Sequence, residues 1–367
     1  MVYKQYGNTG CRVSAIGFGG MQFDDADVQA GRLDACADVV RYAHAQGINY
    51  FDTAPEYCFD KSETIMGLAL SSLPRDSFFI SSKTNFGQVD RPATEAGFFR
   101  RLEKSLTRLK VDSIDFYHLW CMLSLASYRK QCDAMYGWFQ KAKKQGMIKH
   151  IVFSSHMPGE DIAQIIGEGL FEGVLLGYNA VNYRYRQSAV AAAASQGMGV
   201  AVMNPLGGGV IPENPQLFSY LTEGTDLTLA QAALRFVASH REVSVTLNGI
   251  TTKSHVDDAV RAVEGLTELP ADEVTASLQS QGGSFNDLCT GCGYCKGCPQ
   301  DIPIPKFMDS YNLKLFGENP INRLKYHWVV SPAKAAECTA CGRCEELCTQ
   351  HLPIINRLKE IASMPGA

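Results

Sequence analysis

Residues 1–266 alternate strictly between short apolar runs and longer amphipathic segments. The runs are rich in β-branched and aromatic residues and have the length of buried strands. Eight such strands are predicted, beginning near Ser14, Ile48, Phe78, Ser113, His150, Gly173, Gly199 and Val243. Because strands and helices alternate, we expect parallel strands joined by right-handed crossovers.

The number of strand–helix units indicates the architecture. Eight units within residues 1–266 fit a (β/α)8 TIM barrel, which typically needs about 250 residues. A doubly wound sheet is the alternative, but it usually carries a Gly-x-Gly-x-x-Gly turn after its first strand. The segment GFGGMQF, which begins at Gly17, lacks that spacing before a helix. The barrel is therefore the predicted fold.

The composition changes after residue 266. Residues 267–284 are polar and contain Pro270 and a Gly-Gly pair, which is typical of a connector, and we read this one as helical. Residues 285–367 contain two dense cysteine runs and few strand signals. We therefore predict a second, small domain after the connector.

The two runs are CTGCGYCKGCP, from Cys289 to Pro299, and CTACGRCEELC, from Cys338 to Cys348. Thiolates are soft ligands for zinc and for iron–sulfur clusters. Zinc sites usually separate two cysteine pairs by a dozen or more residues, whereas four cysteines at two- and three-residue intervals are typical of bacterial ferredoxins. The spacing predicts a ferredoxin-like domain with two [4Fe–4S] clusters. A single cluster, zinc or disulfides are the alternatives.

In two-cluster ferredoxins the fourth cysteine of each run binds the cluster of the other run. That arrangement predicts one ligand set of Cys289, Cys292, Cys295 and Cys348, and another of Cys338, Cys341, Cys344 and Cys298. Pro299 follows the first run as this pattern expects, but Thr349 follows the second.

Three residues of the barrel indicate proton-transfer chemistry. Asp52 ends a predicted strand, Tyr57 follows in the next loop, and Lys83 ends the neighbouring strand. The C-terminal ends of barrel strands form the face where barrel enzymes react. A lysine in such apolar surroundings needs a counter-charge, and Asp52 is the nearest candidate. An ion pair beside a phenol would help to move the phenolic proton.

With these residues the chain resembles the aldo-keto reductase superfamily over residues 1–265. The similarity includes GNTGCRVSAIGFGGM at the start, the Asp-Thr-Ala…Tyr…Ser-Glu loop, the lysine strand and NPLGGG. The whole chain resembles the subfamily that carries a C-terminal ferredoxin-type domain. The resemblance implies an NAD(P)H-dependent oxidoreductase that reduces a carbonyl of a small molecule. It also implies that Tyr57 protonates the carbonyl oxygen while Lys83 and Asp52 adjust the acidity of the phenol.

The histidine of the family pattern, near the end of the fourth strand, is displaced here. DFYHLW places Trp120 in that position and His118 two residues earlier. Residues two apart on a strand face the same side, so His118 is expected in the barrel interior, about 6–7 Å deeper. Three possibilities stay open: His118 acts from below, His156 contributes, or no histidine acts and Trp120 shapes the pocket.

The resemblance also implies a set of contacts to NADP(H) or NAD(H). The nicotinamide would meet Ser154, Ser155 and Asn179, and an adenosine 2′-phosphate would meet Lys253 and Ser254. Backbone amides of NPLGGG are suited to a pyrophosphate. The residues expected there are Pro205, Leu206, Gly207 and Gly209. The sequence favours NADP(H) over NAD(H).

A hydride carries two electrons and a [4Fe–4S] cluster passes one, so direct transfer between them is not expected. The clusters could stabilise a small domain, deliver single electrons from a ferredoxin or another redox partner, or dock such a partner. Two other functions are consistent with the sequence. One is an electron-transfer enzyme whose barrel binds substrate without nicotinamide, and the other is a non-catalytic barrel.

Composition excludes several classes of partner. The net charge is −4 and no basic block is present, which argues against nucleic-acid binding. No run of 18 apolar residues predicts a membrane span, and the N-terminus lacks the pattern of a secretory signal. We expect a cytoplasmic protein in a reducing, anaerobic setting.

Overall fold

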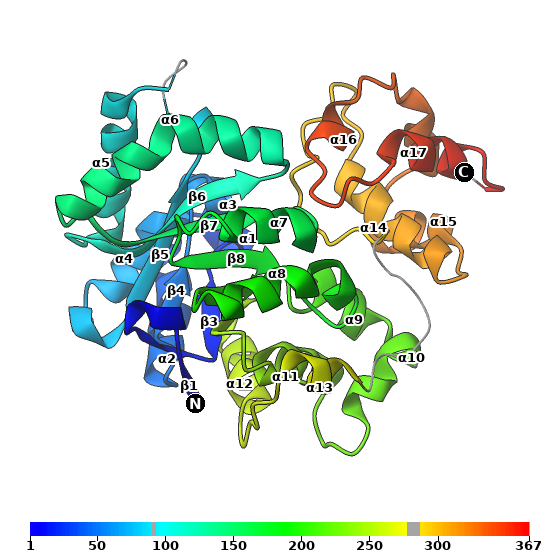
Figure 1. Cartoon of the computed structure of the whole chain (residues 1–367). Helices are drawn as coiled ribbons and strands as arrows, with labels where there is room; N and C mark the ends of the chain where they lie inside the picture. Colours follow the sequence, from blue (N-terminus) through cyan, green and yellow to red (C-terminus); the bar gives the residue numbers. More distant parts are fainter. Residues whose placement is uncertain (90–92, 277–286, 367) are drawn as a thin grey trace. The chain divides into compact units, whose positions relative to one another are not determined.

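The computed structural model describes residues 1–89, 93–276 and 287–366 and divides into two compact units (Figure 1). The barrel unit comprises Met1–Leu206 and Asn214–Gly282. The cysteine unit comprises Gly207–Glu213 and Gly283–Ala367. Each unit is described by itself below.

The barrel unit contains a closed barrel in the order β10-β3-β4-β5-β6-β7-β8-β9. Every neighbouring pair in this ring is parallel, including the pair β10 and β3 that closes it. All eight predicted strands are present, and the predicted (β/α)8 barrel is confirmed. The strands are β3 (Ile16–Gly19), β4 (Tyr50–Asp52), β5 (Phe79–Thr84), β6 (Ile114–Met122), β7 (Ile148–Ser155), β8 (Gly173–Gly177), β9 (Gly199–Met203) and β10 (Val245–Gly249).

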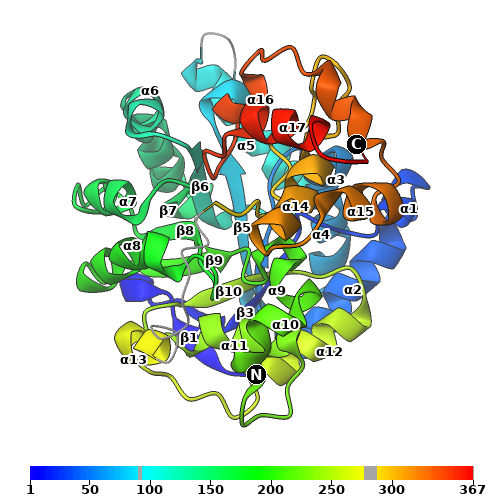
Figure 2. The same ribbon diagram turned by 90° about the vertical axis from the view of Figure 1, so that its right-hand side faces the viewer.

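Helices surround this ring of strands (Figure 2). Their ends follow local capping rules. In α5, for example, the Thr94 side chain accepts from the backbone N–H of Gly97, and Lys110 ends the helix in the left-handed conformation. The helices are α1 (Asp25–Gln29), α2 (Leu33–Ala45), α3 (Tyr57–Asp60), α4 (Ser62–Leu70), α5 (Glu95–Leu109), α6 (Leu125–Lys144), α7 (Gly159–Ile166), α8 (Tyr183–Ser195), α10 (Pro215–Phe218), α11 (Leu229–Ser239), α12 (Lys253–Ala262) and α13 (Ala271–Ala276).

A short antiparallel hairpin, β1 (Tyr3–Gln5) and β2 (Arg12–Ser14), covers the N-terminal end of the barrel. The sequence analysis did not predict it. The ring of Tyr6 is fully buried there, among side chains from the strands. The ring leaves no room for a Cβ on Gly173 or Gly199, the first residues of β8 and β9. These glycines therefore allow the hairpin to seal the barrel.

The contact between Tyr6 and Gly199 is testable by substitution. A Cβ on Gly199 would lie 2.1 Å from Tyr6 Cδ1. We expect Gly199→Ala to lower the free energy of unfolding by about 2 kcal/mol, because the buried ring has to move. Thermal or urea unfolding of the barrel measures this change.

Gly137→Ala is the matched control. Gly137 lies within α6, and nothing lies within 4 Å of a Cβ placed on it. This variant should be more stable than the parent by about 0.5–1 kcal/mol, because alanine favours the helix. If both variants were stabilised, the packing of Tyr6 would not close the barrel.

The cysteine unit is built around α14 and α17, and its described residues, 207–213 and 287–366, form no β-strand. Its core contains apolar side chains and three of the cysteines. The helices are α9 (Val210–Glu213), α14 (Ile304–Leu315), α15 (Pro320–Asn322), α16 (Arg343–Glu346) and α17 (Ile354–Ala362). Of the predicted connector, residues 271–276 form α13, and residues 277–284 lie outside the described residues.

The two cysteine runs lead into the same local structure. Three residues after the last cysteine of each run, Asp301 and His351 both have a φ of 52°. Each is followed by a proline that precedes a helix, and the φ and ψ angles are −77° and 71° at Pro303 and −75° and 68° at Pro353. The unit therefore contains two repeats, one ending in α14 and the other in α17.

None of the described helices has both the length and the apolar character needed to cross a membrane.

Candidate functional site

Asp52 and Lys83 form a buried ion pair at neighbouring strand ends. Asp52 ends β4, Lys83 lies in β5, and the Lys83 side chain is 1% exposed. Lys83 Nζ donates to both carboxylate oxygens of Asp52, each at 2.6 Å, and to the backbone oxygen of Thr53 at 2.8 Å. Burial lowers the pKa of Lys83, and the Asp52 charge opposes this shift. The three oxygen partners compensate the ammonium for its lost hydration.

Tyr57 lies next to this pair, at the start of α3. Lys83 Nζ is 5.4 Å from the centroid of the half-buried Tyr57 ring. The Trp120 ring meets the same ring edge-on, with 5.7 Å between centroids and 87° between planes. The predicted catalytic tyrosine, the ion pair and Trp120 therefore occupy one place at the C-terminal end of the barrel.

The turn that carries Tyr57 is strained. Glu56, Cys58, Phe59 and Asp60 all have positive φ, between 49° and 72°. For residues other than glycine, this conformation costs on the order of 1 kcal/mol each and persists only where the surroundings impose it. Arg108 anchors the end of this turn by donating to Asp60 Oδ1 at 2.7 Å, and that hydrogen bond lowers the pKa of Asp60 to about 2. The sequence analysis missed this anchor.

His118 is fully buried, and it reaches the ion pair through Ser81. The Ser81 hydroxyl donates to Asp52 Oδ1 at 2.7 Å and lies 2.9 Å from His118 Nε2. Burial and the charge of Lys83 lower the pKa of His118 well below its usual value, so the imidazole is neutral. His118 therefore contacts Ser81, which holds Asp52 of the ion pair, whereas Trp120 contacts the ring of Tyr57.

His156 lies at the end of β7 beside a second buried cation. Arg186 is fully buried and donates to the backbone oxygens of His156, Met157 and Gly177 at 2.7, 3.3 and 3.1 Å. Burial and the Arg186 charge lower the pKa of His156 to about 3. The arginine holds the ends of β7 and β8 together, and His156 stays neutral.

The residues predicted to meet the nicotinamide lie at the ends of β7 and β8. Ser154 and Ser155 are buried, and the Ser155 hydroxyl donates to the Met122 backbone oxygen at 3.2 Å. Asn179 Nδ2 donates to the Asn204 backbone oxygen at 2.9 Å. Its Oδ1 accepts from the N–H groups of Val181 and Asn182. The Asn179 amide therefore also shapes the loop after β8.

The glycine-rich loop after β9 is divided between the two units. Pro205 and Leu206 belong to the barrel unit, and Gly207 and Gly209 belong to the cysteine unit. All three glycines of the loop have positive φ. Within the cysteine unit, a Cβ on Gly208 would lie 2.2 Å from the backbone oxygen of Thr290. Close packing on the first cysteine run is therefore a second reason for glycine here.

Lys253 and Ser254 begin α12 and are exposed. Lys253 Nζ lies 5.4 Å from the centroid of the Tyr42 ring, and the Ser254 hydroxyl lies 2.9 Å from that of Thr252. Both side chains are accessible to a ligand at this helix start.

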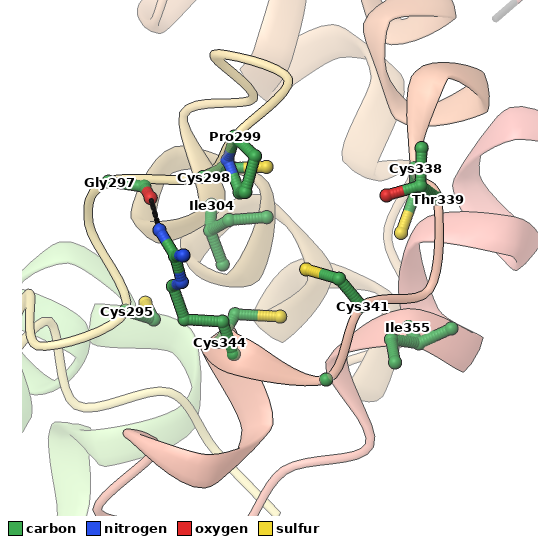
Figure 3. Close-up of a pocket in the computed structure, with 12 residues that line it drawn as sticks. Cys295, Gly297, Cys298, Pro299, Ile304, Cys338, Thr339, Cys341, Cys344 and Ile355 are labelled. Carbon is green, nitrogen blue, oxygen red and sulfur yellow. Dashed lines mark hydrogen bonds between the residues drawn. The ribbon is translucent and has the colours of Figure 1, made fainter.

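The cysteines line two cavities in the cysteine unit. The first contains Cys298 together with Cys338, Cys341 and Cys344, whose side chains lie around one space (Figure 3). The second contains Cys348 together with Cys289, Cys292 and Cys295. Cys295 also borders the first cavity. In each case the fourth cysteine of one run lies with the first three of the other.

Arg343 is the cation among the described lining residues of the two cavities, and the charge of Arg357 acts on Cys289 and Cys348 of the second. Burial raises the pKa of Cys295 to about 12 and that of Cys344 to about 11. Thr349, which replaces the expected proline, is buried, and its hydroxyl lies 3.3 Å from Cys292 Sγ. Throughout the described ranges, no three His, Cys, Asp or Glu side chains converge to hold one metal ion.

Removal of Asp52 tests the ion pair. We expect Asp52→Asn to lower the free energy of unfolding by about 3 kcal/mol or more, because the Lys83 ammonium would stay buried without its counter-charge. Urea unfolding measures this loss.

Asp38→Asn provides a matched control. Asp38 pairs with Arg41 on the surface, where its side chain is 60% exposed, so its loss should change stability by less than about 1 kcal/mol. Equal stability of the two variants would show that the Asp52–Lys83 pair does not support the barrel.

The chain matches the aldo/keto reductase family over residues 15–279, a range that ends before the first cysteine run. It is 28% identical over 299 residues to L-galactose dehydrogenase of Arabidopsis thaliana, covering 75% of this chain and 92% of that protein. It is 25% identical over 221 residues to the NADH-specific methylglyoxal reductase of Escherichia coli, covering 56% and 67%.

Two solved structures share the fold. One is an aldo-keto reductase of Bacillus halodurans in its holo form, with a TM-score of 0.64 and 24% identity over 77% of this chain and 97% of that one. The other is an aldo-keto reductase of Klebsiella pneumoniae in complex with NADPH, with a TM-score of 0.61 and 20% identity over 77% and 96%. By the family match and the barrel together, the chain belongs to the aldo/keto reductase family and is an oxidoreductase.

Proposed function

We propose that the barrel reduces a carbonyl group of a small molecule with NAD(P)H, and that Tyr57 is the proton donor. The contact of the buried Lys83–Asp52 pair with the Tyr57 ring carries this proposal. Tyr57 gives its phenolic proton to the carbonyl oxygen, and the nearby ammonium stabilises the phenolate that remains. Asp52 holds the ammonium in place, and Ser81 and His118 hold Asp52.

Among the three possibilities for the histidine, the contacts favour an indirect role for His118. Its Nε2 is directed at Ser81, and the imidazole is fully buried. Trp120 then borders the substrate carbonyl, since its ring meets Tyr57. The His156 side chain is neutral and lies beside Arg186, so we assign it to the wall of the pocket.

The chain offers groups for each part of a nicotinamide dinucleotide. Ser154, Ser155 and Asn179 would meet the nicotinamide, while Pro205, Leu206, Gly207 and Gly209 would offer backbone to the pyrophosphate. Lys253 and Ser254 would meet a 2′-phosphate, and their exposure suits this role. When bound, NAD(P)H supplies the hydride. The NADPH and NADP complexes of the Klebsiella pneumoniae proteins support this proposal.

Tyr57→Phe tests the assignment of the proton donor. We expect kcat/KM for aldehyde reduction to fall about 10²- to 10⁴-fold, because general acid catalysis is lost, while the Kd for NADPH stays near that of the parent. Steady-state NADPH oxidation with a panel of small aldehydes and ketones, and fluorescence titration, give the two values.

Tyr3→Phe is the control, since it removes a hydroxyl that donates to Gly47 at the opposite end of the barrel. Full activity in Tyr57→Phe would refute the proposal. If the parent bound a carbonyl substrate but no nicotinamide, the alternative of an electron-transfer enzyme would replace this proposal. The Asn179 amide already binds backbone groups of the protein, which favours that alternative.

We further propose that the cysteine unit is a ferredoxin-type domain with two [4Fe–4S] clusters. Each cavity brings three cysteines of one run together with the last cysteine of the other, and Cys295 borders both cavities. The two repeats that follow the runs support a duplicated site. Four thiols spaced around a cavity, without convergence on one point, suit the corners of a cluster better than a single ion.

The composition of the unit favours a stabilising role for the clusters. Three cysteines belong to its small buried core, alongside side chains of α14 and α17. Small domains with few apolar contacts commonly depend on metal sites for their stability. When bound, the clusters also supply one-electron redox chemistry, which a ferredoxin or another redox partner could use.

The pairing of the cysteines is tested by double variants. The anaerobically purified parent should contain about eight irons and about eight sulfides. Cys298→Ala together with Cys338→Ala removes two ligands of one cluster, so about four irons should remain. Cys298→Ala together with Cys289→Ala removes one ligand of each cluster, so almost no iron should remain.

Cys132→Ala is the matched control, because this buried cysteine lies in α6 of the barrel and should leave the iron content unchanged. Zinc in place of iron would refute the proposal. The reverse pattern, with about four irons left in the Cys298→Ala, Cys289→Ala variant and almost none in the other, would refute the crossed pairing alone.

A further inference from the structure

Cys11, His150 and Glu172 form a linear relay at the N-terminal end of the barrel, away from Tyr57. Cys11 Sγ lies 3.5 Å from His150 Nε2, and His150 Nδ1 lies 2.8 Å from Glu172 Oε1. Cys11 belongs to the loop of the hairpin β1–β2, His150 lies near the start of β7, and Glu172 precedes β8. A thiol, an imidazole and a carboxylate in this order match the general arrangement of an activated nucleophile.

The imidazole is held in a fixed orientation. Glu172 Oε2 accepts from Lys143 Nζ at 2.6 Å and from the N–H of Ile151 at 3.0 Å, which immobilises the carboxylate. The Phe116 ring stacks on His150, with 5.2 Å between centroids and 26° between planes. His150 is therefore packed on its face and bonded at both nitrogens.

The electrostatics favour a proton on the imidazole. Burial alone would lower the pKa of His150, but its contacts with Cys11 and Glu172 outweigh burial and raise it to about 9. Hydrogen bonds from His150 and Lys143 outweigh burial of Glu172 and lower its pKa to about 2.

The other titratable or charged groups that face the relay are few. Among the described residues they are Lys143 and Tyr136 from α6 and Tyr6 from the hairpin. Arg12 lies over the Tyr3 ring, and Lys149 pairs with Asp115.

A metal site does not explain these residues. The thiol and the carboxylate contact opposite nitrogens of one imidazole, so they cannot bind the same ion as that ring. Among the residues that the structure describes, these three are not placed as a metal-binding group.

Three of the other scattered cysteines, Cys36, Cys58 and Cys132, have ordinary surroundings. Cys36 and Cys132 are buried. Cys58 Sγ donates to the Met21 backbone oxygen at 3.2 Å, and burial raises its pKa to about 11. Cys11 is partly exposed, and its sulfur contacts a histidine.

We propose that Cys11 is a reactive thiol that undergoes exchange with low-molecular-weight disulfides. The Cys11 thiol gives its proton to solvent, and the protonated His150 stabilises the thiolate, which attacks one sulfur of the disulfide. A bond forms between Cys11 Sγ and that sulfur as the original S–S bond breaks. The leaving thiolate takes a proton from solvent and departs as a thiol. Glu172 keeps the imidazole aligned and stabilises its charge.

Pulsed alkylation of the full holoprotein tests the relay. Iodoacetamide is added anaerobically at pH 6.5 and pH 9.5, and peptide mass spectrometry follows Cys11 and Cys58 separately. Because the thiolate is the reactive form, Cys11 of the parent should react at pH 6.5 about tenfold or more faster than Cys11 of His150→Gln. This ratio should approach one at pH 9.5, where thiols ionise without help.

Glu172→Gln serves as a second variant in case His150→Gln does not fold, and it should give an intermediate rate. Cys58 in the same digest should react slowly at pH 6.5 in all proteins. Equal Cys11 rates at pH 6.5 in the parent and both variants would overturn the proposal.

Exchange itself is measured with glutathione disulfide and, separately, with cystamine at pH 7. At least one should leave a mixed disulfide on the Cys11 peptide. Cys11→Ser should give no adduct there and should keep the carbonyl reductase activity of the parent. Absence of an adduct with both disulfides would overturn the proposal, whatever the outcome for Tyr57.

Discussion

The ammonium of Lys83 lies where water has almost no access, and the site at the end of the barrel depends on how that charge is compensated. Asp52 supplies a carboxylate and Thr53 a carbonyl oxygen, all within 2.8 Å. These groups come from β4 and the residue after it, so the pair joins two neighbouring strands. Because both strands are parallel members of a closed barrel, the charges necessarily meet at the C-terminal end. The Tyr57 ring therefore lies beside the Lys83 ammonium, which itself stays buried from solvent.

The eight strands of the barrel could be predicted from the sequence because parallel buried strands are continuous apolar runs. The hairpin β1–β2 could not, since strands of three residues are too short to show an alternating pattern. The Asp52–Lys83 pair could be anticipated because a lysine at a buried strand end requires a counter-charge.

Contacts that depend on the tilt and stagger of the strands were beyond prediction. Ser81 links Asp52 to His118 across β4, β5 and β6, and no local pattern of residues signals that link. Arg108 and Asp60 lie 48 residues apart, and their pairing supports an unusual turn that the sequence does not announce. The relay that ends at Cys11 is similar, because its thiol and imidazole are 139 residues apart.

The grouping of the cysteines follows a spacing rule, but the reason for Thr349 appears only in three dimensions. Its hydroxyl lies 3.3 Å from Cys292 Sγ, a contact that a proline could not make. At the equivalent position of the other repeat stands Pro299, which has no hydroxyl, so this contact has no counterpart there. Hydrogen bonds to ligand sulfurs raise the reduction potential of an iron–sulfur cluster. Clusters in these two cavities would therefore differ in the hydrogen bonding of their ligand sulfurs, and the Thr349 contact would raise the reduction potential of the cluster beside Cys292.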